Sequence, residues 1–186
     1  WHCARHGVIA GLDPAIHRRH GRQQMDARVK PAHDGLLLMN PSFHLRPYQA
    51  CDEDAAIALW HDTWQLAYPS IDFTKRLDWW RERWRSELVP QAAIIVAEQD
   101  GAMTAFVTID GAGYLDQLVV APAHWGTRLA AALVDEAKRR SPQGVTLKVN
   151  ADNFRALTFY RRQGFVETGE EMNSSGRLVL NLAWQP

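Results

Sequence analysis

The stretch from Trp125 to Ala130 joins a glycine-containing loop to the start of an amphipathic helix, and this combination is suited to holding an anion. The first turn of a helix carries N–H groups without helical partners and a partial positive charge. Gly126 has no side chain, so it lets such N–H groups approach phosphate oxygens closely. The sequence therefore predicts an anion site at this loop.

Two residues that could take part in proton transfer lie just before that loop. Tyr114 and Asp116 alternate with Leu118 and Val120 in GYLDQLVVAP, and a strand would place all four side chains on one face. Tyr160 lies further along the chain, at an apolar-periodic position. A carboxylate can accept a proton, and a phenol beside an apolar wall keeps its proton at neutral pH. By pattern alone, each of these residues is also compatible with a packing or orienting role.

The elements that must position these residues follow from hydrophobic periodicity and turn residues. Three β-rich runs separated by Asp100-Gly101 and Gly111-Ala-Gly113 indicate an antiparallel meander. The order of strands and helices mixes this meander with crossover helices, so we predict an α+β fold with a mixed central sheet. The predicted strands are 43–47, 92–99, 103–110, 113–122, 145–150, 165–172 and 177–184, and the predicted helices are 55–68, 74–88, 125–140 and 153–163.

Residues 1–42 differ from the rest of the chain, because they show no sustained helical or strand period. We expect them to be a disordered extension that the domain at 43–186 does not need, with Met39 as the true start. This segment holds five of the eight histidines, but their scattered spacing argues against a metal site. These histidines are His2, His6, His17, His20 and His33.

Composition narrows the class of protein. A chain of 186 residues with 46% apolar and 23% charged residues suits one globular domain. No membrane span or secretion signal is visible, and two cysteines without metal or disulfide context suit a reducing cytoplasm. Residues 1–42 carry six Lys and Arg against three Asp, whereas the remainder is net acidic. We therefore expect neither nucleic acid nor a membrane as a partner.

Two motifs give the chain a resemblance to the GNAT acetyltransferases that covers residues 43–184. The first is LDQLVVAPAHWGTRLAAALVDEAKRR, and the second is VNADNFRALTFYRRQGF, which matches a family run at Asn153, Ala156, Phe159, Tyr160, Gly164 and Phe165. The resemblance implies a mostly antiparallel sheet of about seven strands with about four helices. It also implies direct acetyl transfer from acetyl-CoA to a primary amine, without a covalent enzyme intermediate or a metal.

The first motif implies the site for the pyrophosphate of acetyl-CoA, at Trp125, Gly126, Thr127, Arg128, Leu129 and Ala130. Trp125 stands where the family has Arg or Gln, as in a bacterial branch that shares LDQL, VN-x-DN-x-R-A and SGR. Arg128 replaces the central glycine of the family's loop. Its cation could pair with a phosphate of CoA, or it could be a solvated arginine that crowds the loop.

The resemblance also assigns roles around the acyl group. The main chain of Leu118, Val119 and Val120 would pair with the pantetheine arm, and an N–H there would polarise the thioester carbonyl. Asn153 would cap its helix and contact the cofactor, and Tyr160 would protonate the leaving thiolate.

The acceptor side of the predicted site is less specific. Asp116 is our candidate general base, with a water relay as the alternative. Trp64, Tyr68 and Tyr114 are expected to line the acceptor pocket, whereas Trp60 and most of the second-helix tryptophans are expected to be core.

The sequence leaves the acceptor open between a small-molecule amine and a peptide amine, and a homodimer is an allowed assembly. The alternative function is a GNAT-fold protein that binds CoA or another ligand without efficient turnover, suggested by Arg128 at the glycine position.

Overall fold

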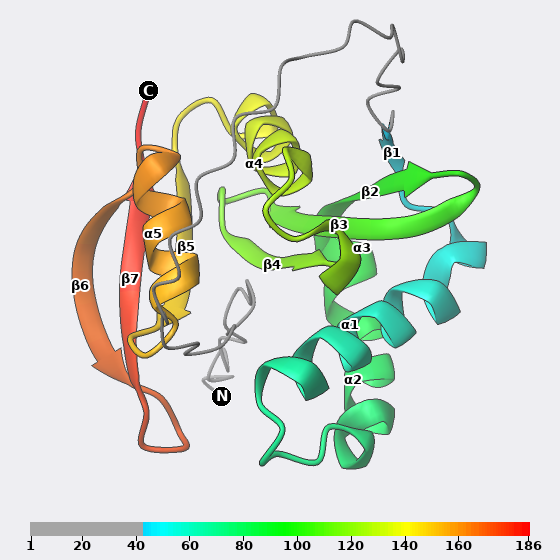
Figure 1. Ribbon diagram of the computed structural model, residues 1–186. Helices are drawn as coiled ribbons and strands as arrows, with labels where there is room; N and C mark the ends of the chain where they lie inside the picture. Colours follow the sequence, from blue (N-terminus) through cyan, green and yellow to red (C-terminus); the bar gives the residue numbers. More distant parts are fainter. Residues whose placement is uncertain (1–42) are drawn as a thin grey trace, which may run out of the picture.

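The computed structural model describes residues 43–186. Seven strands form two antiparallel sheets that lie side by side (Figure 1). The four-stranded sheet has the order β1-β2-β3-β4, and the three-stranded sheet has the order β5-β7-β6. The strands are β1 (His44–Pro47), β2 (Ala92–Gln99), β3 (Ala102–Asp110), β4 (Leu115–Val120), β5 (Val145–Asn150), β6 (Val166–Met172) and β7 (Leu178–Trp184).

The expectations for residues 1–42, including Met39 as the start, lie outside the described residues. Within 43–186, the predicted α+β class and strand order are confirmed. No helix in this described part combines the length and the apolar character that crossing a bilayer requires. The helices are α1 (Glu53–Ala67), α2 (Leu77–Arg83), α3 (Val89–Gln91), α4 (Leu129–Arg140) and α5 (Phe154–Arg162), with a π-helical turn at Trp84–Leu88 between α2 and α3.

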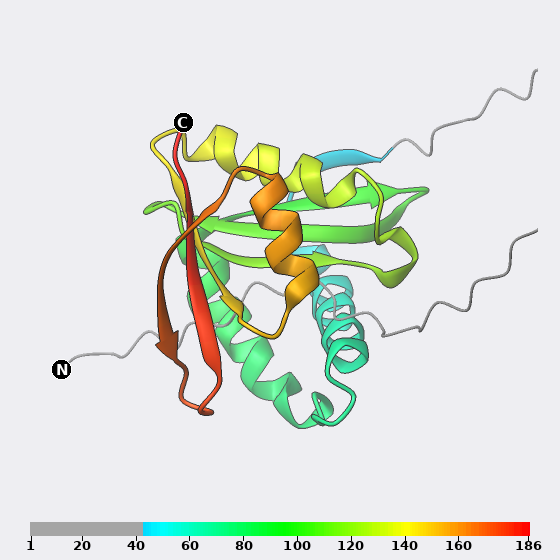
Figure 2. The same cartoon turned by 60° about the vertical axis from the view of Figure 1, so that its left-hand side comes forward.

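Helices cover both faces of the four-stranded sheet (Figure 2). Helix α4 lies on one face, and its Leu133 belongs to a core that includes Val107 of β3. Helices α1 and α2 lie on the other face, where Trp60 and Trp84 pack with Phe106. Helix α5 lies beside the three-stranded sheet. The alternation of side chains along β3 therefore feeds two separate cores.

The two sheets meet at a single described bridge. Tyr114 pairs in parallel with Thr146, and the Thr146 N–H donates to the Gly113 carbonyl at 2.9 Å. Beyond this point no described ladder joins β4 to β5. The two strands therefore splay apart beyond this bridge, which leaves one edge of β4 without a partner strand among residues 43–186.

A β-bulge in β4 changes the direction of Asp116. Thr108 of β3 pairs with Gln117 and Ile109 pairs with Leu115, so Asp116 is the extra residue in the ladder. A bulge re-aims side chains by breaking strand alternation. The prediction that Asp116 shares a face with Leu118 and Val120 is wrong for this reason: those two side chains pack on the α4 side, whereas Asp116 contacts α2.

Candidate functional site

The free edge of β4 exposes two sets of main-chain groups to the opening between the sheets. Antiparallel ladders alternate between residues whose N–H and C=O groups face the partner strand and residues whose groups face away. The Ala121 N–H donates to Thr104 of β3 at 2.8 Å, and this bond fixes the alternation. The groups of Leu118 and Val120 consequently face away from β3. Those of Val119 face β3, so the expectation that the main chain of Val119 pairs with a cofactor is corrected.

Trp125 contacts this same edge. Its indole Nε1 donates to the Val120 carbonyl at 2.7 Å, and the Arg155 guanidinium lies 5.0 Å from the centre of its ring. The residue that replaces the usual Arg or Gln therefore links the loop, β4 and the first turn of α5. The Val120 carbonyl is thereby occupied, which leaves the Val120 N–H and both main-chain groups of Leu118 directed into the opening.

The predicted anion loop ends in the first turn of α4. The helix begins at Leu129, four residues later than predicted, because Trp125 has an extended backbone and Gly126 has a positive φ, and neither conformation is helical. The Thr127 hydroxyl accepts from the Leu129 N–H at 3.3 Å, whereas the N–H groups of Ala130 and Ala131 have no acceptor among the described residues. Gly126 has φ +76°, and a Cβ there would meet no atom within 4 Å. The loop thus presents free donors beside an open space.

Arg128 occupies the position of the family's central glycine without backbone strain. Its φ is −74° and its ψ is −5°, a conformation open to any L-residue, and its side chain is exposed. The interpretation that this arginine distorts the loop is therefore not supported by its geometry. Its cation lies at the N-cap of α4, where the helix itself favours negative charge.

Tyr160 faces the interior from α5. The side chain is fully buried and packs edge to face against Phe159 and Phe165, with ring centres 5.2 and 5.4 Å away. Its hydroxyl has no hydrogen-bond partner among the described residues. Burial raises the pKa of Tyr160 well above its usual range, and the neighbouring Tyr114 adds to this effect. The phenol therefore stays protonated at neutral pH and has a proton to donate.

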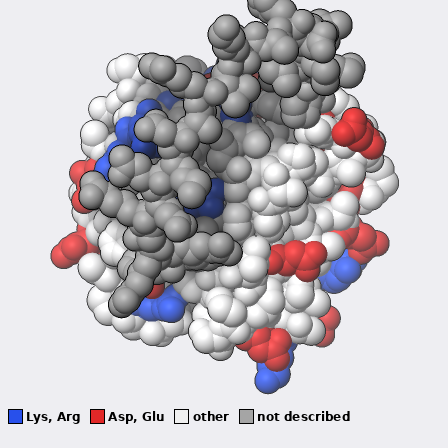
Figure 3. Space-filling model, in the orientation of Figure 1, with Lys and Arg blue, Asp and Glu red and all other residues white. Residues whose placement is uncertain are grey.

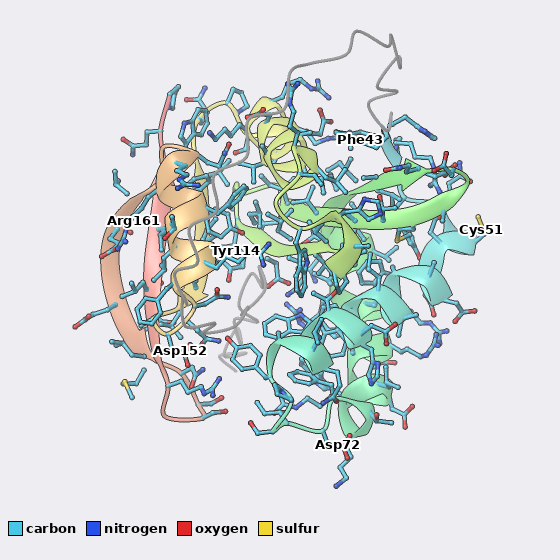
Figure 4. The ribbon with its side chains drawn as sticks, viewed as in Figure 1. Phe43, Cys51, Asp72, Tyr114, Asp152 and Arg161 are labelled. Atoms are coloured by element: carbon cyan, nitrogen blue, oxygen red, sulfur yellow. The ribbon has the colours of Figure 1, made fainter. Side chains whose placement is uncertain are left out.

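Tyr114 lies between the four-stranded sheet and α5 (Figure 4). Its hydroxyl is also buried and without a partner in the described part of the chain. Burial raises the pKa of Tyr114, and the carboxylate of Asp116 raises it further. Two protonated phenols, Tyr114 and Tyr160, thus come from opposite sides of the splay.

Asp116 forms a buried ion pair that the sequence did not suggest. The Arg83 Nη2 donates to Asp116 Oδ2 at 2.6 Å, and both side chains are less than 10% exposed. Burial raises the pKa of the Asp116 carboxyl, and Arg83 partly offsets that rise by stabilising the charged form. A carboxylate with a raised pKa is a stronger base than an exposed aspartate, which suits a proton acceptor.

Aromatic side chains from α1 and α2 form the opposite wall. Trp60 stacks on Trp80 with ring centres 4.4 Å apart, and Trp64 stacks on Tyr68 at 5.7 Å. Trp60 and Trp80 are buried, as expected for core positions, whereas Trp79 is 47% exposed and is not core. Trp64, which was expected to line the acceptor pocket, is buried as well.

Tyr68 connects this wall to the second sheet. The Asn150 Nδ2 of β5 donates to the Tyr68 hydroxyl at 2.9 Å, and the Arg177 guanidinium lies 5.0 Å from the centre of the Tyr68 ring. Asn153, which was expected to cap α5, does so: its Oδ1 accepts from the Ala156 N–H at 3.0 Å. The described contacts therefore link some of the predicted residues, Tyr114 with Asp116 and Tyr160, and add Arg83 beside Asp116 and Asn150 beside Tyr68.

Little in the sequence indicated that Arg83 belongs to the site. Arg83 lies three residues after Trp80 and one before Trp84, beside a buried stripe, but WRERWRSEL contains three arginines that look alike. On the uncovered part of the face in Figure 3, basic side chains lie next to acidic ones. Nothing in local sequence separates a solvated arginine from the one that crosses to β4.

The described residues fit acetyl-CoA, the acetyl donor that the resemblance implies. Free first-turn N–H groups suit a pyrophosphate, and the outward main chain of Leu118 and Val120 suits an amide-bearing arm lying along the strand. In the same part of the chain, no three His, Cys, Asp or Glu side chains gather in a group that could hold a metal ion.

Comparisons with known proteins point in one direction. A family model described as "Acetyltransferase (GNAT) domain" matches residues 70–185. Peptidyl-lysine N-acetyltransferase YiaC of Escherichia coli (strain K12) is 28% identical over 124 residues, which cover 65% of this chain and 82% of that protein. Peptidyl-lysine N-acetyltransferase YjaB of Salmonella typhimurium (strain LT2) is 29% identical over 132 residues, which cover 69% and 88%.

A solved structure shares the fold. The PaiA N-acetyltransferase of Thermoplasma acidophilum, in complex with coenzyme A, superposes with a TM-score of 0.60 at 18% identity, covering 78% of this chain and 99% of that one.

Proposed function

This chain belongs to the GNAT acetyltransferase family, and from that premise we propose that it acetylates a primary amine inside the opening between β4 and β5. Acetyl-CoA supplies the activated acetyl group. The observation that carries the proposal is that a protonated, buried Tyr160 and a buried Asp116 each lie near Tyr114, next to the unpaired edge of β4. A proton acceptor and a proton donor are the two groups that amine acylation requires.

The roles of the residues follow from where they lie. Ala130 and Ala131 direct N–H groups toward the pyrophosphate position, with Arg128 beside them. The outward N–H of Leu118 or Val120 is suited to donate to the oxygen of the acyl carbonyl. Asp116 takes a proton from the ammonium group of the acceptor, and the amine nitrogen then bonds to the acetyl carbon. Tyr160 gives its proton to the sulfur as the carbon–sulfur bond breaks, and the second proton that the nitrogen loses as the amide forms restores the phenol, while the proton on Asp116 passes to solvent.

The proposal includes the chemical class of the acceptor. The curated relatives are named for peptidyl-lysine, so peptide amines and small-molecule amines are both candidate acceptors.

Cys51 is exposed and carries a free thiol, which suits a reducing compartment, and we place the activity in the cytoplasm. A homodimer remains an allowed assembly, and sedimentation velocity would decide it.

The experiment is amine-dependent release of free thiol from acetyl-CoA over a panel of α-amines, ε-amines and polyamines. The proposal predicts that at least one amine raises the rate well above hydrolysis in buffer. The alternative function, ligand binding without turnover, predicts that CoA binds while no amine on the panel raises thiol release.

Arg128→Ala should weaken CoA binding several-fold, because an exposed cation at the N-cap of α4 adds to the attraction of the helix for phosphate. The ratio between wild-type and variant dissociation constants should grow at low salt, since exposed charges are screened by ions. Isothermal titration with CoA at two salt concentrations measures the dissociation constants of both proteins. Arg128→Gly is the matched control for the family's usual residue, and tighter binding by that variant would show that the arginine is an impediment.

A further inference from the structure

Arg83 and Asp116 are joined by one hydrogen bond, although a guanidinium and a carboxylate can form two. Arg83 Nη2 and Asp116 Oδ2 are bonded at 2.6 Å, and the neighbouring Gln117 side chain also stabilises the Asp116 carboxylate, but Arg83 Nη1 and Asp116 Oδ1 are buried and make no hydrogen bond of their own to the described residues. Nη1 and Nη2 are bonded to the same guanidinium carbon, and Oδ1 and Oδ2 to the same carboxylate carbon. Next to the short bond, Arg83 therefore has one donor nitrogen left over and Asp116 has one acceptor oxygen left over. Buried polar atoms without partners are uncommon in proteins and call for an explanation.

Arg83 cannot easily turn to satisfy itself. Its Nε donates to Glu87 Oε2 at 3.1 Å, and its guanidinium lies 5.4 Å from the centre of the Trp80 ring. Trp80 is in turn stacked on Trp60. Contacts with two residues on its own helical segment and a bond to β4 therefore fix the plane of the guanidinium, and with it the direction of Nη1.

Asp116 is held equally firmly, because the β-bulge that aims it at α2 is part of the β3–β4 ladder. A ligand that completes this pair must offer a donor to Asp116 Oδ1 and an acceptor to Arg83 Nη1. An ammonium group supplies the donor. A carbonyl or carboxylate oxygen on the carbon next to the amine-bearing carbon supplies an acceptor close to that donor.

We propose that Arg83 and Asp116 together select an α-amine, meaning an amine whose neighbouring carbon carries a carbonyl or carboxylate group, as in an amino acid or a peptide N-terminus. The inference rests on the proposed acetyl transfer and narrows its acceptor. Asp116 Oδ1 accepts a hydrogen bond from the amine, and Arg83 Nη1 donates one to the oxygen. The ε-amine of a lysine side chain has only methylenes next to it and leaves Arg83 Nη1 unpaired.

Three matched amines test this selection in the wild-type protein. Phenylalanine, phenylalaninamide and phenethylamine share the ring and the amine and differ only in the carboxylate, the amide or neither. We expect kcat/KM to be about tenfold or more higher for one or both of the first two than for phenethylamine, the range of a hydrogen bond to a charged group. The better of the two distinguishes a free amino acid from a peptide N-terminus, and Nα-acetyl-lysinamide serves as the ε-amine.

Arg83→Lys is the control for the intrinsic reactivity of each amine, because α-amines have a lower pKa than ε-amines and react differently without any recognition. Lysine keeps the charge beside Asp116 but lacks the second nitrogen of the guanidinium fork. The preference for an α-oxygen, expressed as a ratio of kcat/KM values, should fall toward one in this variant. A thermal melt reports whether the variant is folded, and the wild-type comparison stands if it is not.

Three outcomes would overturn the inference. Equal kcat/KM for the three phenyl amines would show that water completes the pair, and an unchanged ratio in Arg83→Lys would show that the preference arises elsewhere. A clear advantage for Nα-acetyl-lysinamide would also contradict it, while leaving the proposed acetyl transfer intact. Absence of amine-dependent turnover with every amine, in contrast, would remove the proposed function itself.

Discussion

Replacing Tyr160 by phenylalanine should lower kcat by about 10²- to 10⁴-fold, because the change removes the proposed proton donor and keeps the ring. The free energy of unfolding should hold or rise slightly, since the Tyr160 hydroxyl is buried without a partner among the described residues. The dissociation constant for CoA should also hold, because Phe159 and Phe165 still pack against the ring. Steady-state turnover across pH, with the best amine found, measures the effect.

Tyr114→Phe is the matched control for this prediction. Tyr114 is also protonated, its hydroxyl is buried without a described partner, and it lies on the other side of the splay. A large fall in kcat for Tyr160→Phe with a small one for Tyr114→Phe would assign the donor to α5. The reverse pattern would move that role to β4. An unchanged kcat for Tyr160→Phe, at a pH where chemistry limits the rate, would leave water as the acid.

Replacing Asp116 by asparagine should lower kcat/KM by about 10²-fold or more, because an amide cannot accept a proton from the acceptor amine. The asparagine carbonyl can still accept from Arg83, so the geometry of the pair can persist. The charge on Arg83 would then be buried without its partner, and we expect a loss of stability of about 3 to 5 kcal/mol. Thermal melts must therefore accompany the kinetics, at a temperature where the variant is folded.

The pH profile separates the two effects of that substitution. A base must be deprotonated to act, so kcat/KM should fall as pH drops below the pKa of Asp116. Burial raises this pKa, so that limb should lie above the usual range of aspartate. The Asp116→Asn variant should lose the limb as well as the rate. A variant that is slower but keeps the limb would show that another group, or a water chain, takes the proton.

The hydrophobic pattern was sufficient for the elements of the fold. The β-rich runs AAIIVAEQ and MTAFVTID, bounded by turn residues, predicted β2 and β3 closely, because both faces of each strand are buried in a core. Helix periodicity predicted α5 and its cap at Asn153, where the capping bond is local. It placed the start of α4 too early, since the backbone of Trp125 and Gly126 is not helical.

The site depended on features that local pattern does not encode. The bulge at Asp116 arises from the pairing of β4 with β3, and no feature of LDQLVV itself indicates it. The contact between Arg83 and Asp116 spans 33 residues and two elements. The π-helical turn at Trp84–Leu88, just after Arg83, likewise follows from packing rather than from propensity. The family resemblance predicted the region of the site, and contacts between distant elements determine which side chains lie there.

The most direct measurement of the central claim is the mass of the amine after incubation with acetyl-CoA that carries an isotope-labelled acetyl group. The account predicts an amine heavier by one labelled acetyl group, formed in a one-to-one ratio with free thiol. It also predicts that Tyr160→Phe and Asp116→Asn form this product far more slowly while CoA still binds. Thiol release without labelled amine, or equal labelling by wild type and both variants, would contradict acetyl transfer in the opening between β4 and β5.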